Sequence, residues 1–166
     1  MEIRFKDRNI VEIDHARIRF RNFAGKGGQY NREGDRNFAV VIPNREIAEE
    51  LINDTNQYGV GWNVKIKEPR NEEEDEFIFL PVKVKFNGRG PAVYLETNGV
   101  RNQLKEESVS LLDSVDILDV SLDIRPYDDV INGKPFRTAY LQSLLVIQDV
   151  DRFAPRDRDF EEEEDY

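Results

Sequence analysis

The sequence contains no cysteine and a single histidine, His15, among its 166 residues. The absence of cysteine excludes disulfide bonds, thiolate zinc sites and cysteine nucleophiles. A single histidine leaves few ways to build a histidine-based catalytic or zinc centre. No stretch approaches about 18 consecutive apolar residues, and the first residues lack the apolar run of a signal peptide. We therefore expect a soluble chain with a cytoplasmic location.

Motifs that support catalysis are also scarce. The segment Gly25-Lys26-Gly27-Gly28 is glycine-rich and basic but lacks the spacing of a phosphate-binding loop. It is either a loop that touches a polyanion or an ordinary hairpin loop. A second segment holds the carboxylates Asp113, Asp116, Asp119 and Asp123, which could form a two-metal site. Because Asp119 and Asp123 alternate with core aliphatic residues, a solvated sheet face is favoured, and we predict no enzyme, metal or cofactor.

The charge is distributed unevenly. The chain has 24 basic and 34 acidic residues, a net charge of −10. Residues 1–42 nevertheless hold nine lysines and arginines against six acids, whereas residues 149–166 hold nine acids against three arginines. More than half of the negative excess thus lies in an acidic tail, and the net charge does not exclude a polyanionic partner.

Alternation of apolar and polar residues with period two predicts a mainly β protein. The expected strands are residues 16–23, 36–42, 62–67, 77–86, 92–97, 117–125 and 136–148. Helical spacing predicts a helix over 44–57, capped by Asn44 and stopped by Gly59, and a weaker one over 105–112. Asn87-Gly88 predicts a tight turn after which 92–97 pairs with 77–86 as a hairpin, and Asn132-Gly133 predicts a second hairpin whose return strand is 136–148. The pattern fits an antiparallel five-stranded barrel of the oligonucleotide-binding (OB) type with extra hairpin strands, and it fits a sandwich as well.

The outward faces of these strands combine aromatic rings with cations. In 16–23, parity places Arg17, Arg19, Arg21 and Phe23 outward, opposite Ala16, Ile18 and Phe20. Single-stranded nucleic acid needs this combination, because rings stack on bases while cations neutralise phosphates. The alternative for each ring is burial under a loop or helix. The predicted DNA-binding residues are Arg17, Arg19, Arg21, Phe23, Lys26, Tyr30, Arg32, Arg36, Lys65, Lys67, Phe77, Phe79, Lys83, Lys85 and Tyr94, and Tyr140 also falls outward by parity.

The C-terminal segment carries a second signal. Residues 161–165 are five consecutive acids, followed by the aromatic Tyr166. Like charges at this density are expected to stay disordered, while the final ring gives a partner an anchor. The same tail can compete with DNA for the basic face. The predicted partner-binding residues are Phe160, Glu161, Glu162, Glu163, Glu164, Asp165 and Tyr166.

Several segments together resemble a known family. They are Arg21-Asn22-Phe23-Ala24-Gly25, Gly34-Asp35-Arg36-Asn37-Phe38, Gly61-Trp62-Asn63-Val64-Lys65 and Arg125-Pro126-Tyr127. With the acidic tail, they are similar to the single-stranded DNA-binding proteins of bacteriophages, although no long linker precedes the tail and the last residue is tyrosine. The resemblance implies a single OB-like domain over 1–148 and a tail over 149–166. It implies sequence-independent binding of single strands in DNA replication or recombination, partner proteins recruited by the tail, a possible homo-oligomer, and the host-cell cytoplasm if the protein is phage-encoded.

Two other hypotheses stay open. The acidic runs at 72–76 and 161–165 suit an acidic protein-interaction module or a DNA mimic that occupies a host nuclease or polymerase. A virion structural protein is a third possibility, and it predicts stable assembly without nucleic acid.

Overall fold

The computed structural model describes residues 1–88 and 90–150, and within them it is mainly β. The helices are α1 (Arg45–Asn53) and the short 3-10 turns η1 (Asp7–Asn9) and η2 (Val109–Asp113). The strands are β1 (Glu2–Phe5), β2 (Val11–Asp14), β3 (Arg17–Asn22), β4 (Arg36–Val41), β5 (Lys65–Lys67), β6 (Phe77–Val84), β7 (Ala92–Thr97), β8 (Val100–Leu104), β9 (Ile117–Ile131) and β10 (Lys134–Gln148). No helix of the described residues is long and apolar enough to cross a membrane. Of the predicted tail, residues 151–166 lie outside the described part of the chain.

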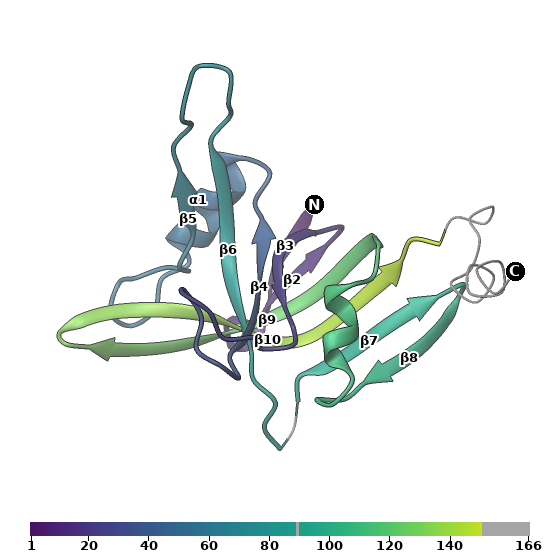
Figure 1. Cartoon of the computed structure of the whole chain (residues 1–166). Helices are drawn as coiled ribbons and strands as arrows, with labels where there is room; N and C mark the ends of the chain where they lie inside the picture. Colours follow the sequence, from purple (N-terminus) through teal and green to yellow (C-terminus); the bar gives the residue numbers. More distant parts are fainter. Residues whose placement is uncertain (89, 151–166) are drawn as a thin grey trace, which may run out of the picture.

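Five strands form the barrel-like body in the order β3-β4-β6-β10-β9 (Figure 1). Their neighbours are antiparallel, except that β6 and β10 are parallel. Within the described residues the strand ladder does not close on itself, but the amide of Ala16, just before β3, donates to the carbonyl of Val120 in β9 over 2.9 Å. The prediction of a mainly β, OB-like fold is confirmed.

The remaining strands extend this body at its edges. The β1–β2 hairpin pairs through β2 with β9, and β5 pairs with the first half of β6. Asn87-Gly88 does form a turn, closed by hydrogen bonds between Asn87 and Gly90. The predicted pairing of 77–86 with 92–97 is wrong, because β7 lies parallel to β10 and forms its hairpin with β8. That hairpin turns at Asn98-Gly99, both at positive φ, a signal equal to the two that the sequence analysis used.

The core is formed by the inward residues of the sheet together with residues of α1 and η2. The Asn44 side chain accepts a hydrogen bond from the Ile47 amide and begins the helix, as expected. Ala48 and Leu51 of α1 are buried against it, and α1 ends at Asn53, earlier than predicted. The alternation of β6 is also confirmed, since its even-numbered residues face the core. These are Ile78, Leu80, Val82 and Val84.

Two irregularities reverse parts of the predicted pattern. The β3–β4 register shifts between Arg19 and Asn22, and Phe20 has φ of 55°. This bulge turns Phe20 outward, 55% exposed, and places Phe23 in the core with no exposed surface. In β9 a register shift beside its first residue leaves Leu118 67% exposed instead of buried. Strict alternation therefore fails where one extra residue enters a strand.

Candidate nucleic-acid interface

The outward face of β6 is the centre of the site. Phe77, Phe79 and Lys83 of β6, and Lys85 just after it, point away from the core because the alternate residues fill it. Those inward residues are Ile78, Leu80, Val82 and Val84. Strand register places Tyr140 of β10 beside Lys83 on one side and Asn37 of β4 beside it on the other. The face thus spans β4, β6 and β10.

The first aromatic cluster lies at the start of β6 and consists of Phe20, Phe77 and Phe79. The rings of Phe77 and Phe79 are stacked with centroids 5.2 Å apart, and Phe20 meets both edge-on at 6.0 and 5.8 Å. The Arg19 guanidinium lies 5.1 Å from the Phe77 ring centroid, and the Lys67 ammonium lies 5.7 Å from that of Phe79. Rings and cations are therefore presented together, as base stacking beside a phosphate backbone requires.

The second aromatic cluster lies on the β9–β10 hairpin and consists of Tyr127, Phe136 and Tyr140. Tyr127 stacks on Tyr140 with centroids 5.2 Å apart and lies 6.3 Å from Phe136. Arg125 and Lys85 approach the Tyr140 ring at 5.2 and 5.4 Å. Two groups of rings, each with its own cations, thus occupy one face of the molecule.

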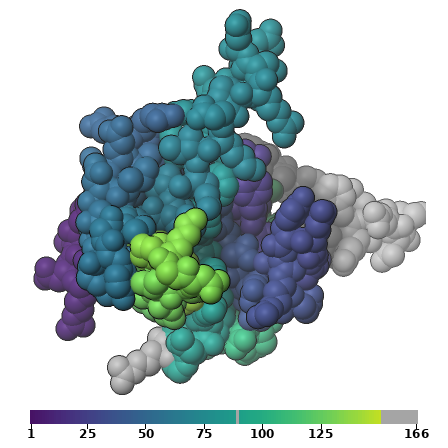
Figure 2. Space-filling model, turned by 90° about the vertical axis from the view of Figure 1, so that its left-hand side faces the viewer, coloured from purple at the N-terminus to yellow at the C-terminus, as the bar shows by residue number. Residues whose placement is uncertain are grey.

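A cleft of about 570 Å³ separates the β3–β4 connection from the end of β6. Its lining includes Tyr30, Arg32, Asn37, Lys83 and Lys85. Figure 2 shows the β3–β4 connection and the β9–β10 hairpin projecting on the same side of the molecule. The cleft adjoins Lys83 and Lys85, so it continues the aromatic and cationic face.

Most of the predicted site residues are placed where a ligand can reach them. Arg17 and Lys65 are both exposed. Lys65 of β5 lies directly beside Phe79, and Arg17 of β3 lies on its other side, one strand further away, beside Val41 of β4. Lys26 is exposed in the β3–β4 connection, as is Tyr30, whose side chain is 94% exposed.

Three of the predicted residues do not join this face, and a fourth, Arg36, lines the cleft but is engaged in contacts within the protein. Arg21 donates from Nη1 to the carbonyls of Leu112 and Val115, at 2.9 and 2.7 Å, and so ties β3 to η2. Phe23 stacks on Phe38 in the core at 5.2 Å, so its expected stacking on a base is ruled out by burial. Arg36 is half-buried, where Nε donates to the Phe23 carbonyl and Nη1 to Glu106. Tyr94 lies on β7, beside Leu145 and Gln103.

The second cluster is only partly indicated by the sequence. Tyr140 and Arg125 fall outward by parity, and Arg125-Pro126-Tyr127 is one of the segments of resemblance, but none of the cluster's rings is among the predicted DNA-binding residues, and Phe136 has no predicted role. The signal was present, since a two-residue turn at Asn132-Gly133 fixes the register of β9 and β10 and places Arg125 opposite Tyr140. Phe20 carried no such signal, because its exposure depends on the bulge.

Three of the four carboxylates considered as a metal site, Asp113, Asp119 and Asp123, have separate structural partners. The Asp113 carboxylate accepts hydrogen bonds from the backbone amides of Phe23 and Ala24, at 2.8 and 2.9 Å. Asp119 lies 3.1 Å from His15 Nδ1, and Asp123 accepts from the Ser143 hydroxyl. In the part of the chain that the structure describes, no three His, Cys, Asp or Glu side chains gather in a way that could hold a metal ion.

Ion pairs also organise the surface beside these carboxylates. Arg4 of β1 bridges Glu12 and Asp14 of β2. Its hydrogen bond to Asp14 holds the pKa of that carboxyl below its usual value. Arg45 of α1 forms two hydrogen bonds with the Glu76 carboxylate, both 2.7 Å, and they lower the pKa of Glu76 in the same way.

An OB-like domain that displays aromatic and cationic side chains on one sheet face has the architecture of a nucleic-acid-binding module. Over residues 2–163 the sequence matches the family described as "Putative phage ssDNA-binding domain". The chain belongs to this family.

Solved structures show the same fold. The single-stranded DNA-binding protein from bacteriophage Enc34, in complex with ssDNA, superposes with a TM-score of 0.59 at 16% identity, covering 90% of this chain and 92% of that one. A second structure of the Enc34 single-stranded DNA-binding protein gives a TM-score of 0.57 at 15% identity, covering 92% of this chain and 88% of that one. Its C-terminal truncation gives 0.56 at 15% identity, covering 90% and 91%. No curated protein matches the chain by sequence.

Proposed function

We propose that this protein binds single-stranded DNA, largely independently of sequence, through the face formed by β3, β4, β6, β9 and β10. The observation that carries the proposal is the gathering of two aromatic clusters and their cations on one outward sheet face. Membership of the phage family and the fold shared with the Enc34 protein support the choice of ligand.

The spacing of the clusters suits an extended strand. Phe79 and Lys83 are four residues apart on β6, which is roughly 13 Å at about 3.3 Å per residue. Lys83 lies beside Tyr140, so a strand that stacks on Phe79 and continues along β6 reaches the second cluster within a few nucleotides. Every base has a flat face that can stack, so such a platform does not select a sequence.

The biological role that we propose is support of phage DNA replication or recombination in the host-cell cytoplasm. Acidic residues and two rings in 160–166 would recruit replication or recombination proteins, and the same residues would compete with DNA for the cationic face. A homo-oligomer is compatible with such a role. Composition and family membership support this part of the proposal.

Fluorescence anisotropy tests the binding function directly. A labelled thymidine oligonucleotide of roughly 30 nucleotides is compared with a duplex of equal length across a salt series, for the full chain and for a chain that ends at Pro155. We expect preference for the single strand, weaker binding at higher salt, and tighter binding without the tail.

Matched variants assign the binding to the face. Phe77→Ala and Tyr140→Ala each remove one stacking ring and should weaken binding. Phe5→Ala removes a 44% exposed ring of β1 that lies outside both clusters, and it should leave DNA binding unchanged. If neither the full chain nor the chain that ends at Pro155 binds single-stranded DNA, the proposal is overturned and the acidic interaction module is favoured instead.

A further inference from the structure

The β9–β10 hairpin extends past the strands that support it. Each of its strands is 15 residues long, yet β10 pairs with β6 only at Ala139 and Tyr140. Between Lys134 and Thr138, the sole described strand partner of β10 is β9. Figure 1 shows this part of the hairpin projecting away from the body. Its position must therefore depend on contacts other than strand pairing.

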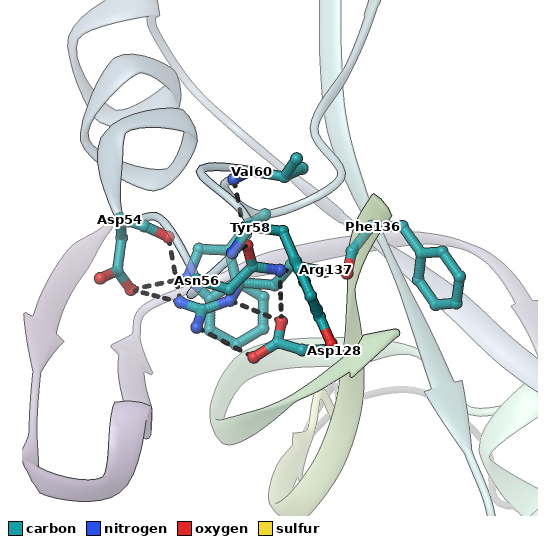
Figure 3. Close-up of polar contacts among 8 residues, drawn as sticks. Asp54, Asn56, Tyr58, Val60, Asp128, Phe136 and Arg137 are labelled. Atoms are coloured by element: carbon teal, nitrogen blue, oxygen red, sulfur yellow. Dashed lines mark hydrogen bonds and ion pairs between the residues drawn. The ribbon is translucent and has the colours of Figure 1, made fainter. Parts of the chain in front are cut away.

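Those contacts come from residues 54–63, the segment that follows α1, which we term the bracket. The Asn63 amide donates to the Arg137 carbonyl over 3.2 Å. Asn56 donates from Nδ2 to Asp128 Oδ1 at 3.1 Å and to the Phe136 carbonyl at 3.2 Å. The Asn56 side-chain oxygen accepts the amides of Tyr58 and Val60, so one buried amide both shapes the bracket and ties it to the hairpin (Figure 3).

Arg137 is the hub of this network. Its side chain is 2% exposed and forms a fork on Asp128, with Nε–Oδ1 at 2.9 Å and Nη2–Oδ2 at 3.1 Å. Its remaining terminal nitrogen donates to the Asp54 carbonyl at 3.0 Å and lies 3.5 Å from the Asp54 carboxylate. The guanidinium also lies 5.3 Å from the Trp62 ring centroid, and the Trp62 indole N–H donates to Asp54. Asp54 and Asp128 thus meet at one buried cation (Figure 3), and Trp62 packs beside it.

The network and the second aromatic cluster occupy opposite faces of the hairpin. Neighbouring residues of a strand point to opposite sides, so Asp128 faces the bracket while Tyr127 faces outward. On β10, Arg137 likewise faces the bracket, while Phe136 faces outward. The bracket therefore holds the hairpin from behind while its front presents Tyr127 and Phe136 beside Tyr140.

We propose that Arg137 is a positioning residue for single-stranded DNA: without touching the ligand, it fixes the hairpin so that the second aromatic cluster lies in register with the cations of β6. This inference rests on the proposed function. A guanidinium fork is needed because one planar group must satisfy Asp128 and the Asp54 carbonyl at once, which the single ammonium of lysine cannot do.

Two substitutions test the proposal. Arg137→Lys keeps the positive charge but loses the two-bonded guanidinium contact with Asp128. Asp128→Asn removes the carboxylate of Asp128, while Arg137 keeps its contacts with Asp54. Arg4→Lys is the matched control, since Arg4 also bridges two carboxylates but on the β1–β2 hairpin. Hydrogen exchange reports the mobility of hairpin amides, anisotropy reports DNA affinity, and the salt series reports phosphate contacts. Asp128→Asn keeps the test decisive if Arg137→Lys fails to fold.

We expect amides of 127–137 to exchange roughly tenfold faster in both variants while those of β4 do not change. DNA affinity should fall about fivefold or more because the site is less preorganised, with the salt slope unchanged. Unchanged exchange, or faster exchange with full affinity, would overturn the positioning role, as would a shallower salt slope. If the unsubstituted protein does not bind single strands, the proposed function fails, and the exchange comparison still decides whether Arg137 holds the hairpin.

Discussion

Phe23 and Phe79 offer the sharpest test of the structure, because the sequence pattern assigns both rings to one DNA-binding face and the structure separates them. Phe23 is fully buried and stacked on Phe38, whereas Phe79 is half-buried in the first aromatic cluster. Replacing each with alanine should therefore affect different properties of the protein. Phe23→Ala should reduce stability, and Phe79→Ala should reduce DNA affinity.

The magnitudes follow from the two environments. Removing a buried phenylalanine costs about 3–5 kcal/mol of unfolding free energy through lost transfer energy and a residual cavity. For a chain of this length this lowers the melting temperature by roughly 6–20 °C. Losing one stacked base at Phe79 costs about 1–3 kcal/mol of binding free energy, which is roughly a 5- to 150-fold increase in Kd. Phe79→Ala also loses aromatic contacts with Phe20 and Phe77, worth about 0.5–1.5 kcal/mol each.

The assay combines urea unfolding with anisotropy on the same samples. Kd is determined for the folded fraction, so that instability is not mistaken for weak binding. We expect Phe23→Ala to bind with the affinity of the unsubstituted protein, and Phe79→Ala to bind more weakly while losing less unfolding free energy than Phe23→Ala, about 1–3 kcal/mol from its two ring contacts. If Phe23→Ala is fully stable but binds poorly, the ring is not in the core and the bulge at Phe20 is wrongly placed.

Three further predictions concern charge, packing and pH. Lys83→Gln with Lys85→Gln should make the slope of log K against log salt shallower by about 1.4, because two phosphate contacts are lost at about 0.7 each. Gly61→Ala should destabilise the fold by about 3 kcal/mol in urea unfolding, because a Cβ there collides with a backbone carbonyl of α1. The ion pair with Arg45 lowers the pKa of Glu76. This pair therefore stabilises the folded protein fully above the ordinary pKa of glutamate, and the stabilisation is lost as pH falls below about 4. Glu76→Gln should consequently lose less stability between about pH 5 and pH 3 than the unsubstituted protein does, as measured by urea unfolding at both values.

The elements that the sequence predicts well are those governed by local patterns. The inward residues of β6 follow from alternation, α1 follows from the Asn44 cap and its helical spacing, and the β9–β10 hairpin follows from Asn132-Gly133. Each of these signals acts within a few residues of the chain. The sequence also indicates the composition of the site, since its cations and most of its rings lie on predicted strands.

The tertiary structure decides which of these side chains share a surface. The bulge that exposes Phe20 and buries Phe23 depends on the pairing of β3 with β4, and Arg21 donates to the carbonyls of Leu112 in η2 and Val115 just after it, 91 and 94 residues away. Likewise, β7 pairs with β10 and not with its sequence neighbour β6. The sequence by itself therefore indicated seven of the ten described strands, the helix α1 and the chemical character of the protein, whereas β1, β2 and β8 lie outside the predicted strands. Only the fold decided which rings face the ligand, because burial and register depend on partners that are distant along the chain.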